Sequence, residues 1–254
     1  MTVLEAVALL VGAFAAGAIN AVAGGGSLVS FPALLAVGYP AKAANVTNTV
    51  ALLPGYLGGS LAYGPELRRQ RSRVVALAAP SVGGAIAGSA VLLLTPGEAF
   101  EAVVPFLILF AAALMVFQGP LSQFAQTHRL GSEGGDHIPA GLYASVFALA
   151  IYGAYFGAGL GIITLAFLAI LLPDDIQHSN ALKGILSLII NVTGAATFVL
   201  FGPVKWGAVL IMALGALAGG YLGVGLARRL GPVYLRWAVV CYAVVVAIVL
   251  LVSD

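Results

Sequence analysis

Apolar residues run along this chain in long blocks, and short polar stretches separate the blocks. Ten apolar segments can be delimited, at 4–22, 27–38, 42–64, 74–94, 99–117, 139–157, 160–172, 177–201, 206–227 and 233–252. Most have 19–25 residues, which is enough for a helix to cross a hydrocarbon core of about 30 Å. The pattern therefore predicts an all-α fold, a polytopic bundle of transmembrane helices.

Two of the segments are too short for an upright crossing. Segments 27–38 and 160–172 have 12 and 13 residues, about 18–20 Å of helix. Each follows a glycine-rich stretch, 24–26 in the first case and 157–161 in the second. Glycine costs a helix roughly 1 kcal/mol per residue relative to alanine, and non-helical backbone at membrane depth must be satisfied by protein or a polar cavity. We therefore predict two broken helices, whose short second parts either cross at a tilt or re-enter the membrane.

The two halves of the chain resemble each other. A shift of 135 residues superposes Gly24 on Gly159, Gly26 on Gly161 and Asn45 on Asn180, and a shift of 131 superposes 84–88 on 215–219. The order of long, broken, short and polar-headed segments is also the same. We predict a first transmembrane repeat at 1–117, a polar linker at 118–138 and a second transmembrane repeat at 139–254.

Charge distribution sets the orientation of these repeats. The chain is 61% hydrophobic and only 8% charged, whereas soluble domains carry about 25% charged residues. Loop 66–73 holds four arginines, so we place it in the cytoplasm. With alternating spans, seven arginines (68, 69, 71, 73, 129, 228 and 229) lie inside and two lysines (42 and 205) lie outside. The repeats are then inverted, with about five segments each, as in secondary transporters. Both termini lie on the non-cytoplasmic side of the inner membrane.

Polar residues line one face of each polar-headed helix. The first stripe holds Asn45, Asn48, Thr49, Tyr56 and Gly59, and the second holds Asn180, Lys183, Gly184, Ser187, Asn191 and Gly194. These spacings place the members of each stripe on a common face. Such residues either hydrogen-bond to a neighbouring helix or contribute to a substrate site, and we include both stripes in a candidate site.

An anion would suit the centre between the two broken helices. Helix N-termini expose unpaired N–H groups and a partial positive charge, and they bind anions in many proteins. Lys183 lies two turns into an apolar helix, where it either extends to the interface or neutralises an anion; Asp174 and Asp175 are its alternative protein partners. The further candidate residues are Asn20, Gly24, Gly25, Gly26, Ser27, Gly159 and Gly161. Alternatively, these glycines only permit close helix crossing.

The order of these motifs is similar to that of a known family. Residues 24–35 (GGGSLVSFPALL) and 43–49 (AANVTNT), with their echo at 157–180, resemble the sulfite exporter TauE/SafE family across essentially the whole chain. The resemblance implies a bacterial or archaeal membrane transporter linked to export of sulfite or organosulfonates.

We therefore predict a secondary transporter that exports a small anion by alternating access. An anion channel of the same architecture, a membrane enzyme and a scaffold subunit are the alternatives. The sequence holds no metal cluster, phosphate-binding loop or nucleophile–base pair, so we predict no enzymatic activity, no metal and no cofactor. The expected partners are the anionic substrate and the lipid bilayer; a coupling ion and a homodimer stay open, and the net charge of +2 does not suggest nucleic acid.

Overall fold

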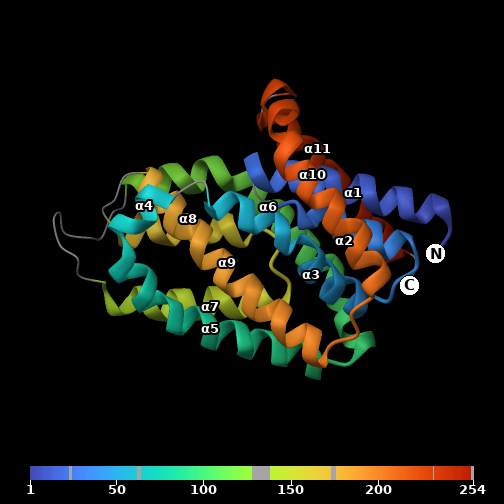
Figure 1. The fold of residues 1–254 in the computed structure, drawn as a ribbon, viewed down its shortest axis with the longest axis horizontal. Coiled ribbons are helices and arrows are strands. Elements are labelled where there is room, and N and C mark those ends of the chain that lie inside the picture. The colour runs from blue at the N-terminus through green and yellow to red at the C-terminus, as the bar shows by residue number, and fades with distance from the viewer. Residues whose placement is uncertain (23–24, 62–63, 128–137, 173–175, 231, 253–254) are drawn as a thin grey trace.

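Helices account for all regular structure in the described part of the chain (Figure 1). The computed structural model describes residues 1–254 except 23–24, 62–63, 128–137, 173–175, 231 and 253–254. The helices are α1 (Val3–Val22), α2 (Ser27–Ala36), α3 (Ala41–Leu61), α4 (Gly64–Arg69), α5 (Arg71–Leu94), α6 (Gly97–Thr127), α7 (Ala140–Tyr155), α8 (Leu160–Leu171), α9 (Ile176–Phe201), α10 (Trp206–Leu230) and α11 (Pro232–Val252). The predicted all-α fold is confirmed.

Each of the ten predicted segments corresponds to one helix, and two boundaries differ. Helix α6 continues to Thr127, into residues expected to form the polar linker. The expected loop at 66–73 is mostly helical, because α4 ends at Arg69 and α5 begins at Arg71. Leucine, arginine and glutamine are good helix formers, and only Gln70 interrupts the helix, where its Nε2 donates to the carbonyl oxygen of His178 at 3.0 Å.

The helices have the length and surface of membrane spans. Within the described residues, α1, α5, α6, α9 and α11 each contain a stretch long and apolar enough to cross a bilayer. Large apolar side chains such as Phe106, Phe201 and Leu214 remain exposed on the bundle, where lipid tails would cover them. The chain is a multi-pass membrane protein.

The short helices α2 and α8 each fold back along the helix before them. A Cβ placed at Gly12 of α1 would lie 3.1 Å from Cβ of Ala33, whereas the first turn of α2 lies against Ala16, further along α1. The two helices are therefore antiparallel. In the second half, Gly153 near the end of α7 faces Leu160 at the start of α8.

Glycines allow α5 to pack directly on α7. A Cβ at Gly84 would overlap the carbonyl oxygen of Phe147, and a Cβ at Gly88 would overlap that of Ile151. Backbones this close are possible only with small residues at the crossing.

The same crossing occurs between α10 and α1. A Cβ at Gly215 or Gly219 would overlap the carbonyl oxygens of Leu10 and Phe14, respectively. The first helix of each half therefore packs on the glycine-rich helix of the other half. The two halves are interlocked in a reciprocal way; their inverted orientation in the membrane stays a prediction.

Candidate functional site

The first helix break lies between α1 and α2, and a side chain of α1 stabilises it. Gly25 has φ +84°, a left-handed conformation that glycine adopts without strain. The amide oxygen of Asn20 accepts a hydrogen bond from the N–H of Gly26 at 2.7 Å. A Cβ at Gly26 would overlap the carbonyl oxygen of Ala16, so only glycine lets α2 begin this close to α1.

Polar side chains from α2 and α3 surround the start of α2. The hydroxyl of Tyr56 lies within hydrogen-bonding reach of the Ser27 and Asn20 side chains. Ser30 Oγ donates to Asn48 Oδ1 at 2.6 Å. Tyr56 belongs to the predicted polar stripe of α3. Ser30 is absent from the predicted site, although it lies one turn after Ser27 and could have been found from that spacing.

The second helix break lies between α7 and α8. Gly157 and Gly159 have φ +76° and +77°, and the Tyr152 hydroxyl donates to the carbonyl oxygen of Ala158 at 2.5 Å. Asn45, which is 1% exposed, reaches this break from α3. Its Nδ2 donates to the carbonyl oxygen of Tyr155 at 2.8 Å. This bond ties the polar helix of the first half to the break in the second half.

Lys183 of α9 lies beside the first turn of α8. A Cβ at Gly161 would lie 3.7 Å from Lys183 Cδ, and the ammonium donates to Asn180 Oδ1 at 3.1 Å. Ser187, one turn further along α9, is 6% exposed. Its hydroxyl has no hydrogen-bond partner among the described residues. Asp174 and Asp175, the predicted alternative partners of the lysine, lie outside the described residues.

The two breaks meet on one turn of α6. A Cβ at Gly25 would lie 3.4 Å from the thioether of Met115, and a Cβ at Gly159 would lie 3.2 Å from Leu114 Cδ1. Nearby, the Phe31 ring of α2 packs edge-on against Phe156 of the second break, with ring centroids 5.5 Å apart. The structure therefore brings the two predicted half-sites together in the protein interior.

Two of the predicted residues have described side-chain hydrogen bonds that stay within their own helices. Thr49 Oγ1 donates to the carbonyl oxygen of Asn45 at 3.1 Å, and Asn191 Nδ2 donates to that of Ser187 at 2.8 Å. Both bonds run four residues back within their own helix. Gly24 lies outside the described residues.

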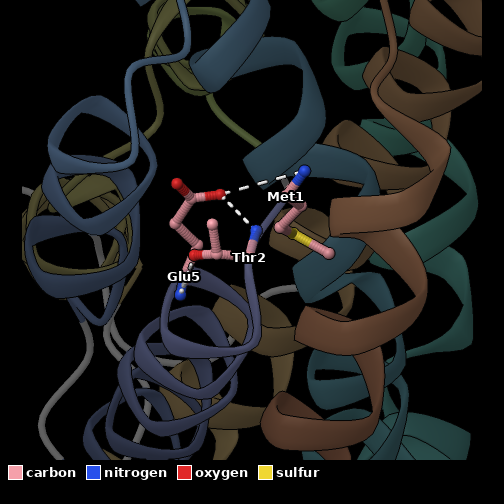
Figure 2. Close-up of polar contacts among 3 residues, drawn as sticks. All are labelled: Met1, Thr2 and Glu5. Carbon is pink, nitrogen blue, oxygen red and sulfur yellow. Dashed lines mark hydrogen bonds and ion pairs between the residues drawn. The ribbon is translucent and has the colours of Figure 1, made fainter.

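An apolar groove lies along α1 and α2. It has a volume of about 500 Å³ and is lined mostly by small and apolar residues of α1 and α2, together with Glu5, Val37 and, from α11, Tyr242. At its end, Figure 2 shows how α1 is capped: Thr2 N–H donates to the Glu5 carboxylate at 2.8 Å, and Glu5 N–H donates to Thr2 Oγ1 at 3.3 Å. This reciprocal pair is a capping box, which the N-terminal amine of Met1 joins at 3.9 Å.

Comparison with known proteins identifies the family. Residues 9–250 match the family model described as "Sulfite exporter TauE/SafE". The chain belongs to the sulfite exporter TauE/SafE family. This TauE/SafE member is 28% identical to the "Probable membrane transporter protein ORF9" of a Sinorhizobium species, over 96% of this chain and 91% of the relative. It is 30% identical to a "Probable membrane transporter protein" of Haemophilus influenzae, over 89% and 87% of the two chains.

A third relative and the structural comparison complete the findings. The "Probable membrane transporter protein YfcA" of Escherichia coli K12 is 25% identical over 94% of this chain and 87% of its own. No solved structure matches significantly. Family and relatives agree with the helical membrane architecture, so the protein is a membrane transporter of the TauE/SafE type.

Proposed function

We propose that this TauE/SafE member exports a small anion, sulfite or an organosulfonate, across the inner membrane by alternating access. The observation that carries the proposal is the meeting of two helix breaks on one turn of α6, beside Met115 and Leu114. The N-terminal turns of α2 and α8 both start there, and helix N-termini favour anions. The family description supplies sulfite as the first substrate to test.

The bond between Asn45 and Tyr155 is suited to a reversible movement. It joins an element of each half at 2.8 Å, and Asn45, whose side chain donates it, is 1% exposed. A neutral hydrogen bond contributes a net of only about 0.5–1.5 kcal/mol. It can therefore stabilise one conformation of the transporter without preventing conversion to the other. Alternating access around a central site is the movement expected of transporters built from inverted repeats.

Flux measurements in proteoliposomes test the function. Vesicles loaded with sulfite or ethanesulfonate should release the anion at a rate that saturates with its internal concentration. Asn45→Ala should lower this rate about tenfold, because the contact between α3 and the second break is lost. Thr197→Val is the matched control, because the described hydrogen bond of the Thr197 hydroxyl runs within α9, at 3.0 Å to the carbonyl oxygen of Thr193.

The same vesicles separate the transporter from other classes. Flux that does not saturate, together with single-channel currents in a planar bilayer, would replace the transporter with an anion channel. The complete absence of flux with every anion would overturn the proposal and favour a scaffold role.

A further inference from the structure

The two helix breaks are chemically unequal. At the first break, the polar groups satisfy one another: Asn20 accepts from the N–H of Gly26, and Ser30 donates to Asn48. Tyr56 lies in reach of Ser27 and Asn20. The described side chains of this cluster carry no formal charge, so an incoming anion would have to displace bonds that already exist.

The second break combines a cation with an unused donor. The aliphatic part of the Lys183 side chain lies beside Gly161. Among the described residues, its ammonium donates only to a neutral amide oxygen, that of Asn180. The described part of the chain contains no acidic side chain paired with this ammonium. An uncompensated cation at membrane depth costs free energy, which a bound anion would offset.

Ser187 is a second candidate ligand at the start of α8. A Cβ at Gly153 would lie 2.7 Å from Leu160 and 2.9 Å from Ile190, so the first turn of α8 lies against α9 between Lys183 and Ile190. Ser187 lies between these two residues on the same face of α9. Its hydroxyl is buried and has no partner among the described residues, and it is available as a donor to a group at the start of α8.

We infer that the start of α8, with Lys183 and Ser187, is the subsite for the charged group of the substrate, and that it selects singly charged anions, which are a sulfonate or hydrogensulfite rather than the sulfite dianion. This inference rests on the proposed function. The described groups at the subsite supply one formal positive charge together with neutral donors. A doubly charged anion would bury one negative charge without compensation, which is costly in a protein interior. The first break then contacts the uncharged remainder of the substrate.

Binding to the purified protein in detergent tests the subsite without requiring transport. Isothermal titration compares ethanesulfonate with sulfate as a dianion and dimethyl sulfone as a neutral molecule of similar shape. Wild-type protein should bind ethanesulfonate at least about tenfold more tightly than sulfate and should bind dimethyl sulfone more weakly still.

Variants assign the binding to the named groups. Lys183→Gln should weaken ethanesulfonate binding about tenfold to a hundredfold, as expected for a hydrogen bond to a charged group, and Lys183→Arg should restore most of it. Ser187→Ala should weaken binding about threefold to tenfold. Ser89→Ala is the matched control. The Ser89 hydroxyl of α5 is also buried and without a described partner, but it faces Gly194, which lies about two turns beyond Ser187 along α9.

The outcomes separate this inference from the proposed function. Equal affinity for sulfate and ethanesulfonate, or unchanged affinity in both Lys183→Gln and Ser187→Ala, would overturn the inference while saturable flux still supported the transporter. No binding of any monoanion by the wild-type protein would also overturn it. If Lys183→Gln fails to fold, Ser187→Ala against Ser89→Ala decides.

Discussion

Lys42 shows how one side chain can join two helices at their ends. Its ammonium donates to the carbonyl oxygens of Leu93 and Thr95 at 2.6 and 2.9 Å. These carbonyls lie at the C-terminal end of α5, where a helix has acceptors without intrahelical partners and a partial negative charge. From the sequence, Lys42 is only a charge in an outer loop; the structure gives it a capping role between α3 and α5.

Removal of this cap should destabilise the protein. Lys42→Ala leaves the two carbonyl oxygens without their cationic donor, so we expect the free energy of unfolding to fall by about 1–3 kcal/mol. Thermal unfolding in detergent, followed by circular dichroism, measures the change. Lys205→Ala is the control, because Lys205 is exposed and its described hydrogen bonds are made by its backbone: the N–H donates to Thr47 Oγ1 at 3.1 Å, and the carbonyl oxygen accepts from Val209 N–H at 3.0 Å. Equal effects of the two substitutions would contradict the capping role.

Polar and charged residues in apolar helices could be selected from the sequence as candidates, but their hydrogen-bond partners could not be predicted. Asn45 and Lys183 stand out because polar and charged residues are rare in apolar helices. Ser30 was missed because its importance comes from Asn48, eighteen residues later and in another helix. Likewise, nothing local to Asn45 indicates that it bonds to Tyr155. A hydrogen bond between distant segments depends on how helices pack, and a single sequence does not encode packing as a local pattern.

At the scale of helices, the glycine motifs specify contact faces rather than partners. The likeness of 84–88 and 215–219 predicted that two glycine-rich helices occupy similar places. The structure shows that one packs on α7 and the other on α1, each time in the opposite half of the chain. A stripe of small residues indicates where a helix can be approached closely, but the approaching helix follows only from the whole arrangement.

Adjacent glycines of α10 allow a sharp test of this crossing. In Gly219→Ala the new methyl group would overlap the carbonyl oxygen of Phe14, whereas at Gly220 no atom lies within 4 Å of a Cβ. We expect Gly219→Ala to lower the free energy of unfolding by about 1–3 kcal/mol. Gly220→Ala should leave it unchanged or raise it, because alanine favours a helix. Chemical unfolding in mixed micelles measures both variants, and similar losses at the two positions would refute the close approach.

Helix ends were the least predictable elements. Helix α6 extends ten residues beyond the predicted end at 117, although Pro120 lies within it. Proline lacks an N–H and usually interrupts a helix, so a proline and a rise in polarity together suggested a linker. Helices α2 and α8 were predicted well because glycines with positive φ mark their starts.

For the molecule as a whole, the folded-back helices bear on topology. Figure 1 places α4 at one end of the long axis and both chain ends at the other. If the α1–α2 and α7–α8 pairs each return to their own side, three helices remain to cross in each half. An odd number of crossings would orient the halves in opposite directions, as the predicted inversion requires.

Reporter fusions test this topology directly. Alkaline phosphatase fused after residue 254 should be active, because we place the C-terminus outside the cytoplasm, and the same enzyme fused after Gln70 should be inactive. A fluorescent protein that folds only in the cytoplasm should give the reverse result at both positions. Activity of the phosphatase after Gln70 would show that the arginine-rich segment faces outward and would reject the assigned orientation.

The reciprocal packing of α1 on α10 and of α5 on α7 also constrains biogenesis. Helix α1 emerges from the ribosome well before α10, yet the surface that receives α1 is built by α10. Until α10 has been synthesised, the small-residue surface of α1 must be shielded by lipid, by the insertion machinery or by a temporary neighbour. Half-length fragments made separately should therefore be degraded in the cell, and simultaneous production of both should protect them.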